Sequence, residues 1–339
     1  MEQFGRTIRV VVHGVTLVDQ RASGNEDVAP TLDCDFQVTR WVKPEPQPLT
    51  LTVYNLSEEN RNRLTQQQER AAQIGWKRLQ AVQSGAVLVL PGQEAAVQQS
   101  LVAETGRVEI FAGYGDDAGR LCSYQIMPQD GIKHEFTGVD WVTTIRAQDG
   151  RLPWQNAWVT QSMAPGILLR DVQRVLLASE ELLEGTLDEE TFSEAYPELL
   201  QYKPTPGYRN GYVLHGPTHE MNTDLLETLG LDAFYRDGTL QYTLKGAASW
   251  PDAVRLSTAN NVIAVPEAME RGFYRAKSLI DHRLEPGRQV QLFGDDDVTP
   301  IGVGTFRIEE VVYTGSNYAQ PFDATMILRP SGITASANP

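Results

Sequence analysis

Short segments in which apolar and polar residues alternate recur along both halves of this 339-residue chain. In one of them Cys34, Phe36, Val38 and Val42 fall on the same side of an extended chain, with polar residues between them. A period of two predicts half-buried strands, since one face of each strand then lies in a core and the other in solvent. Several such strands separated by short turns predict a small barrel or sandwich.

One alternating segment, residues 49–54, runs directly into a helical pattern with no glycine or proline between them. Ser57 has a side chain preferred at a helix N-cap, and Glu58 and Glu59 fall where the helix dipole favours negative charge. We therefore expect a helix from about Glu58, interrupted by Gly75, as part of a helical insertion over residues 58–105.

The patterns divide the chain into blocks, with a proline-rich stiff loop, 43–48, inside the first. The expected fold class is α+β and β-rich, with two small antiparallel β-barrel domains, a small strand–helix–hairpin domain and helical insertions. Thr218 is expected to cap the helix of that small domain, Gly230 to end it, and Asp237-Gly238 to turn the hairpin. The expected blocks are a first barrel at 1–150, a helical acidic connector at 151–209, the small domain at 210–248, a second barrel region at 249–330 and a tail at 331–339.

The composition narrows the classes of function. A net charge of −15 and a pI of about 4.8 argue against specific nucleic-acid binding, which depends on Lys and Arg neutralising phosphates. No apolar run reaches the ~20 residues of a membrane span, and the N-terminus does not resemble a signal peptide, so we expect assembly in a cytoplasm. Cys34 and Cys122 are expected as buried reduced thiols, although a disulfide between them stays open.

No motif predicts catalysis, a metal or a cofactor. His215 and His219 have the spacing of a metal pair, but Gly216 and Pro217 between them prevent a shared helical face. Asp295-Asp296-Asp297 lacks the Gly and terminal Glu of a calcium loop and predicts a charged hairpin turn. The remaining candidates are expected to be structural; they are the isolated His13, His134 and His282 and the glycine-rich segment 113–119, which is followed by a strand rather than a helix.

The succession of motifs is more informative than any one of them. Segment 35–64 takes a strand ending in Tyr-Asn-Leu-Ser into a helix, 108–126 contains Ala-Gly-Tyr, and 141–150 ends in Asp-Gly. Segment 210–246 is the small strand–helix–hairpin unit, and 272–327 contains Leu-x-Pro-Gly and Gly-x-Asn turns. In this order the segments resemble the bacteriophage tail-hub, or baseplate-hub, family, which is related to the N-terminal hub region of type VI secretion spike proteins.

The resemblance implies a non-enzymatic structural protein of the virion tail tip. It implies a homotrimeric hub that joins a six-fold tail tube to a three-fold central spike and leaves a channel for DNA. The implied partners are other copies of the chain, the tube protein and the spike protein, with tape measure and baseplate wedge proteins as further neighbours. Two alternatives stay open: a carbohydrate- or ligand-binding β protein, and a tail-associated cell-wall hydrolase.

Overall fold

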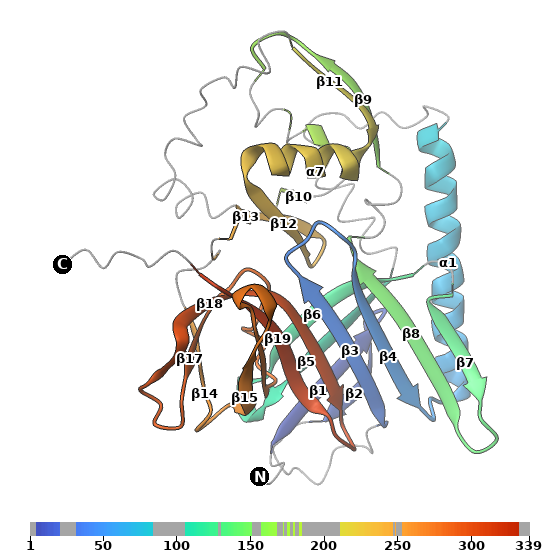
Figure 1. Cartoon of the computed structure of the whole chain (residues 1–339). Helices are drawn as coiled ribbons and strands as arrows, with labels where there is room; N and C mark the ends of the chain where they lie inside the picture. Colours follow the sequence, from blue (N-terminus) through green and yellow to red (C-terminus); the bar gives the residue numbers. More distant parts are fainter. Residues whose placement is uncertain are drawn as a thin grey trace. The chain divides into compact units, whose positions relative to one another are not determined.

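The computed structural model describes residues 5–20, 32–83, 106–127, 130–150, 157–167, 211–246, 248 and 253–331, together with 172, 175–176, 179 and 183–184. The chain divides into two compact units (Figure 1). The first unit comprises Met1–Val42, Gln47–Asp149 and Gly246–Pro339, and the second comprises Lys43–Pro46 and Gly150–Lys245.

The first unit is built on a 14-stranded, mainly antiparallel sheet. A pair of short 3-10 turns, η1 (Gly115–Asp117) and η3 (Glu270–Gly272), connects neighbouring strands. Three strands branch from the main path: β14 (Val254–Ser257), β17 (Gln289–Phe293) and β7 (Ile132–Phe136). The path runs β15 (Val262–Ala268), β16 (Tyr274–Leu279), β19 (Phe322–Pro330), β18 (Pro300–Ser316), β3 (Cys34–Trp41), β4 (Gln47–Tyr54), β8 (Trp141–Asp149), β6 (Gly119–Ile126), β5 (Arg107–Tyr114), β1 (Arg6–Val12) and β2 (Val15–Gln20).

The expectation of two closed barrels is wrong. Strands from both β-rich blocks form one sheet, because β18 pairs with β3 from Glu310 opposite Trp41 to Ser316 opposite Asp35. β18 is 17 residues long, so its first part pairs with β17 and its later part with β3. Alternation marks where strands lie along the sequence but carries no information on which distant strand each one joins.

One hydrophobic core follows from this shared sheet. The expected inward faces are confirmed: Cys34, Phe36 and Val38 are buried on β3, as are Leu49, Leu51 and Val53 on β4. They belong to the same buried cluster as residues of the second block, such as Tyr313 and Met326. The two β-rich blocks are therefore not independent in their cores.

The proline-rich segment was expected to lie outside the sheet, but Gln47 and Pro48 are the first residues of β4. Pro48 has no backbone N–H to donate, which normally excludes it from a central strand. It is tolerated because β3 pairs with β4 only as far as Leu49, while β8 pairs with β4 as far as Gln47. β7, which pairs with β8, was not predicted.

The junction between β4 and the long helix α1 (Glu58–Gln83) depends on three residues that the sequence had singled out. Asn55 adopts a positive φ of 54°, which ends the strand, and its side chain bonds Asp140 and the backbone N–H of Trp141. Leu56 is buried in the core. Ser57 confirms the expected cap, since its hydroxyl accepts the Asn60 N–H at 3.3 Å.

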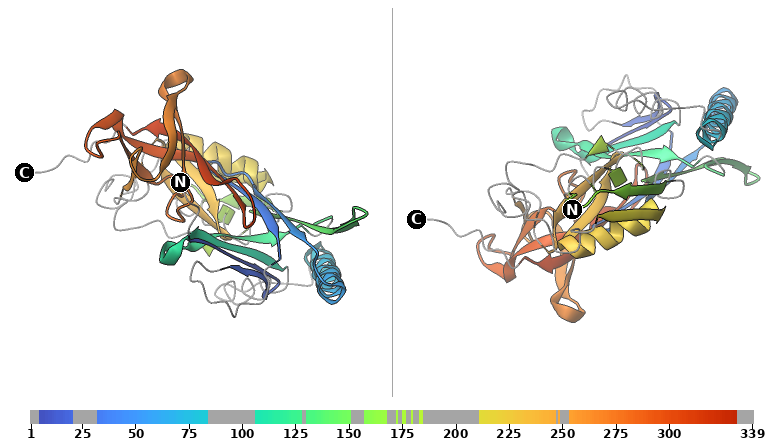
Figure 2. Two further views of the ribbon diagram at one scale, coloured as in Figure 1. Left: turned by 90° about the horizontal axis from the view of Figure 1, so that it is seen from below. Right: turned by 90° about the horizontal axis from the view of Figure 1, so that it is seen from above.

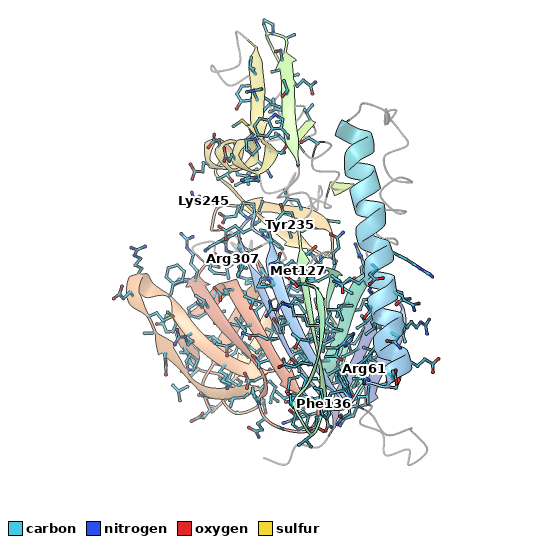
Figure 3. The ribbon with its side chains drawn as sticks, turned by 90° about the vertical axis from the view of Figure 1, so that its right-hand side faces the viewer. Arg61, Met127, Phe136, Tyr235, Lys245 and Arg307 are labelled. Atoms are coloured by element: carbon cyan, nitrogen blue, oxygen red, sulfur yellow. The ribbon has the colours of Figure 1, made fainter. Side chains whose placement is uncertain are left out.

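The first turns of α1 pack on the β7–β8 hairpin, and the helix continues through Gly75 without the expected interruption. The Arg61 guanidinium lies 4.0 Å from the centre of the Trp141 ring, and Figure 3 shows Arg61 and Phe136 at the same end of the unit. His134 bridges the elements, with Nδ1 2.9 Å from the Thr143 hydroxyl and Nε2 3.3 Å from the Thr65 hydroxyl. Among the described residues, no helix is apolar enough over sufficient length to span a membrane.

The second unit contains a two-stranded ribbon, a three-stranded sheet and one described helix of regular length, α7 (Thr218–Leu229). Gly230 ends α7 in the left-handed conformation as expected, and Asp237 and Gly238 turn the hairpin with positive φ angles. Thr218 is not the cap: it is the first helical residue, and its hydroxyl lies 2.9 Å from that of Ser179. The strands are β9 (Trp158–Met163) with β11 (Tyr212–Pro217), and β10 (Leu183–Glu184), β13 (Thr239–Leu244) and β12 (Leu231–Arg236).

β9 and β10 lie within the block 151–209 that was expected to be a helical connector. Most of that block, the part of the helical insertion beyond Gln83 and the tail beyond Ser331 lie outside the described residues. Within the same block, Val172 and Leu176 are buried against Val159 and Leu214.

Replacing Asn55 by Ala is expected to lower the free energy of unfolding by about 1–2 kcal/mol, because Ala resists a positive φ and cannot make the two side-chain bonds. Asn55→Gly keeps the backbone freedom and should cost less. Denaturant unfolding of both variants measures this, with Asn60→Ala as the control. Equal effects of Asn55→Ala and Asn60→Ala would contradict the assigned role.

The pKa of His134 is lowered, first by burial and second by the nearby Arg61 charge. The unfolded state therefore takes up a proton more readily than the native state, and the His134 contribution to stability is present above about pH 6.5 and is lost as the pH falls through the native pKa. Unfolding at pH 7.5 and pH 5 should show a larger loss in the wild type than in His134→Gln, which cannot protonate. Parallel losses would show that His134 does not carry this dependence.

Candidate interaction surface

The two histidines with metal-like spacing have separate environments. His215 lies on β11, where its ring meets Trp158 edge-on at 5.9 Å and its Nδ1 is 3.3 Å from the Thr160 hydroxyl. His219 lies in the first turn of α7. Within the described part of the chain, no group of three or more His, Cys, Asp or Glu side chains is placed to hold a metal ion.

The aspartate run forms the hairpin turn between β17 and β18 that the sequence predicted. Asp296 accepts hydrogen bonds from the backbone N–H groups of Val298 and Thr299 and from the Thr299 hydroxyl. These bonds lower the pKa of Asp296 to about 2. The Asp295 carboxylate accepts the Thr258 hydroxyl, so the run has a local structural explanation.

The glycine-rich segment 113–119 also has a steric explanation. A Cβ on Gly113 would lie 2.6 Å from the Ala118 Cα, and one on Gly119 would lie 2.3 Å from the His282 ring. Glycine therefore allows a tight return of the chain and lets His282 pack flat on β6. His13, the remaining isolated histidine, occupies the β1–β2 turn with φ 51°.

Cys34 and Cys122 are buried and unpaired, as expected. Burial, together with the negative charges of Asp35 and Asp33, raises the pKa of Cys34 to about 12. A thiol held protonated to that extent is a poor nucleophile and a poor metal ligand.

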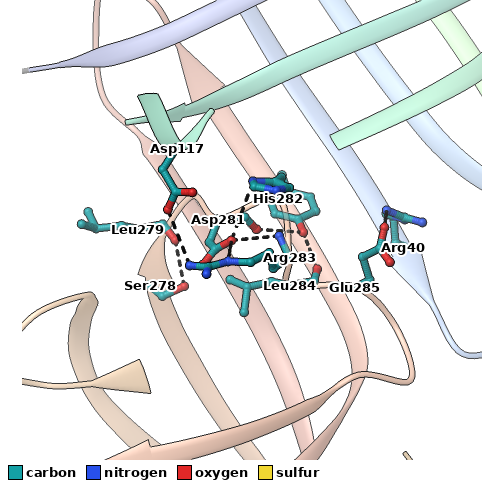
Figure 4. A network of polar contacts seen from close by, with 10 residues as sticks. Arg40, Asp117, Ser278, Leu279, Asp281, His282, Arg283, Leu284 and Glu285 are labelled. Atoms are coloured by element: carbon teal, nitrogen blue, oxygen red, sulfur yellow. Dashed lines mark hydrogen bonds and ion pairs between the residues drawn. The ribbon is translucent and has the colours of Figure 1, made fainter. Parts of the chain in front are cut away.

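A polar network joins β3, β6 and the loop after β16 (Figure 4). The Arg283 side chain makes several hydrogen bonds to Asp281 and lies 3.6 Å from Asp117 on η1. Deeper in the unit, Arg40 donates to the Leu121 carbonyl at 3.1 Å and to Glu285 at 3.3 Å. The network therefore ties the loop of the second β-rich block to strands of the first.

Arg40 falls on the same inward face of the alternating segment as Val38 and Val42, but its charge argued against burial. In the structure its side chain is 1% exposed and its partner Glu285 is 10% exposed. The Tyr313 hydroxyl donates to the Leu284 carbonyl beside them, and burial raises the pKa of Tyr313. A long basic side chain on a strand predicts exposure. Arg40 can be buried because the second β-rich block places the Glu285 carboxylate beside it.

An aromatic and acidic cluster lies on the surface where β4 ends, and we call Asp33, Asp35, Tyr54 and Tyr318 the acidic aromatic patch. Both tyrosine hydroxyls donate to the same oxygen of Asp35, at 3.0 Å from Tyr54 and 2.8 Å from Tyr318. The two rings meet edge-on at 5.9 Å, and Tyr318 is 53% exposed. Within the described part of the chain, neither carboxylate of the patch has a basic partner.

The loop that carries Tyr318 is held on several sides. Arg6 is buried and donates to the carbonyls of Ser316 and Ala319, at 3.1 and 2.6 Å. The Asn317 side chain accepts the Cys34 N–H at 2.8 Å and donates to the Leu32 carbonyl at 2.9 Å. The Gly-x-Asn turn noted in the sequence thus fixes a surface loop to β1 and β3, and the patch is presented on a preorganised support.

No family model matches the chain, and no curated protein matches it. Solved structures do. A tail protein from Neisseria meningitidis MC58 is 10% identical, with 97% of this chain and 98% of that one covered and a TM-score of 0.54. The 43 kDa tail protein of prophage MuSo2 from Shewanella oneidensis is 9% identical, with 96% and 99% covered and a TM-score of 0.54.

These two similarities extend over nearly the full length of both partners, so the chain has the fold of these tail proteins. The resemblance to phage tail proteins that the motif order suggested is confirmed at the level of the fold. A component of the type VI secretion system of E. coli is also similar, with 10% identity, 90% of this chain and 75% of that one covered and a TM-score of 0.46.

Replacing Arg40 by Met should lower the free energy of unfolding by about 3–5 kcal/mol, because Glu285 then keeps a buried charge without its partner. Adding Glu285→Leu to that variant should recover stability, since the buried negative charge is removed. Urea unfolding of the single and double variants tests this coupling.

The exposed pair Lys133 and Asp130, 3.5 Å apart, provides the matched control. Lys133→Met should change stability by less than about 1 kcal/mol. A double variant at positions 40 and 285 that is no more stable than Arg40→Met would contradict the buried pairing.

Proposed function

We propose that the protein is a structural component of a phage-type tail and acts as a homotrimeric hub between a six-fold tail tube and a three-fold central spike. The observation that carries the proposal is the fold shared over nearly the whole chain with two tail proteins, one of them from a prophage. The proposed partners are further copies of the chain, the tube protein and the spike protein, with tape measure and baseplate wedge proteins beside them.

The architecture supports a symmetry-adapting role. Each chain contributes two β-rich blocks that are joined rigidly through β3 and β18 and share one core. Three chains would then present six β-rich blocks to a six-fold ring above and three identical chains to a spike below. Such a role depends on large, permanent interfaces, which typically exceed ~2,000 Å², and uses no catalytic residue.

We further propose that acidic side chains line the channel of this ring. The net charge of −15 supports this, because like charge prevents phosphate from adhering during DNA passage. Neutralising carboxylates that face the channel should slow genome ejection from particles, as measured by DNA release. Unchanged release kinetics would count against the acidic channel.

The trimer is tested by native mass spectrometry of the full chain, alone and mixed with candidate tube and spike proteins. The expected particle has three times the chain mass of 37.7 kDa and gains mass with either partner. A monomer at every concentration that also degrades purified cell wall would instead support the hydrolase. A monomer that binds saccharides would support the ligand-binding alternative.

A further inference from the structure

The hairpin formed by β15, η3 and β16, which we call the arm, projects from the rest of the first unit in both views of Figure 2, where it is orange. It carries apolar side chains that solvent reaches freely: Val265 is 77% exposed, Ile263 47% and Met269 37%. Apolar groups gathered on one projecting element are typical of a surface that another protein covers.

The arm also carries exposed charged side chains. Arg271 lies at its tip and Arg275 on β16, both exposed, and neither forms an ion pair within the described residues. Glu267 is opposite Arg275 in the ladder and also lacks an ion pair there. Glu270, next to Arg271 at the tip, is exposed as well, so the arm offers two guanidinium groups and two carboxylates beside an apolar surface.

Backbone pairing along the free edge of the arm is disfavoured. β15 is the last strand of the sheet path, but its register with β16 shifts on both sides of Ala264, and Pro266 lacks an N–H. A partner of this edge must therefore be recognised mainly through side chains.

The acidic aromatic patch has the complementary chemistry. Asp33 and Asp35 bring negative charge without a basic partner among the described residues, and Tyr54 and Tyr318 bring ring faces beside it. A guanidinium binds such a combination well, because it donates to a carboxylate while stacking on an aromatic ring.

The arm and the patch of one chain are too far apart to meet. Tyr274, next to the arm tip, pairs with Leu328 near the end of β19, whereas Tyr318 lies just before the start of that strand at Phe322. Leu328 and Phe322 are six residues apart on an extended strand, so the arm tip and the patch lie about 20 Å apart along β19. The complementary surfaces therefore lie near opposite ends of the same strand, which is the arrangement that produces head-to-tail contacts between copies.

We propose that the arm of one copy docks on the acidic aromatic patch of the next copy, with Arg271 and Arg275 binding Asp33 and Asp35. The proposal rests on the homotrimeric hub, for which it names a contact between subunits. Each copy uses a different surface on either side, so three contacts of one kind close the ring.

Charge reversal of the full chain tests the contact. The patch variant carries Asp33→Arg and Asp35→Arg, the arm variant carries Arg271→Asp and Arg275→Asp, and a combined variant carries all four changes. Native mass spectrometry should give trimers for the wild type, monomers for the patch and arm variants, and trimers again for the combined variant.

Controls separate docking from folding. Asp tolerates the positive φ of 61° at position 271, so the arm variant should keep its thermal unfolding temperature. Since Asp35→Arg also removes the tyrosine bonds, Asp33→Arg alone is a milder patch variant that should weaken assembly without unfolding. The matched charge control is Arg63→Asp with Arg146→Asp, which changes two exposed arginines outside the arm and should leave the trimer intact.

Mixing the arm and patch variants adds a test of closure. A contact between an arm variant and a patch variant always joins opposite charges, whereas a contact between two copies of the same variant joins like charges. A ring of three must contain two copies of one variant, so one of its contacts always joins like charges. We expect no recovery of trimers in the mixture. An open dimer of one arm variant and one patch variant, which has one matched contact, is expected instead, whereas a closed tetramer would overturn threefold closure through this contact.

The outcomes distinguish this proposal from the proposed function. Reversed variants that remain trimeric, or a combined variant that stays monomeric, would overturn arm-to-patch docking while the hub itself stands. A wild type that is monomeric at every concentration would overturn both.

Discussion

The pairing of β18 with β3 is the interaction on which the rest of the first unit depends. β3 comes from the N-terminal part of the chain and β18 from near its C-terminus, so the ladder closes a loop of more than two hundred residues. Closing so long a loop costs entropy, and the shared core on the inner face offsets that cost. Because of this ladder, the two β-rich blocks form one sheet instead of two barrels.

Polar side chains also connect the two β-rich blocks at several points. Arg40 on β3 meets Glu285 from the second block, and Arg6 on β1 holds the loop between β18 and β19. A buried ion pair adds little net stability, but breaking it is costly, so it selects this arrangement over others. Asn317, which bonds the backbone on either side of Asp33, has the same effect at the surface.

The proposed role in a tail would require interaction surfaces held in fixed positions. A subunit in a permanent assembly keeps its interaction surfaces in fixed relation, and here the patch and the arm both belong to elements tied into one sheet. Tyr318 is displayed by a loop with anchors on β1 and β3, and the arm is a continuation of two ladder strands. Neither surface depends on a side chain that must reorganise before contact.

The sequence alone determined the local elements. Alternation placed β3 and β4 with the correct inward faces, Ser57 marked the start of α1, and Gly230 and Asp237 marked the end of α7 and the following hairpin. These features depend on neighbours within a few residues, whose propensities and capping groups can be read directly. The order of motifs also pointed to the tail-protein fold.

The tertiary structure decided what depends on distant residues. The burial of Arg40, the place of Pro48 inside a central strand, the strand β9 and the single sheet all follow from partners far along the chain. The patch is of the same kind, because Asp35 and Tyr54 lie on the neighbouring strands β3 and β4, but Tyr318 reaches them only after β18 joins β3. Periodicity in the sequence reflects only which face of one strand is buried. Which strands pair depends on the packing of many strands together.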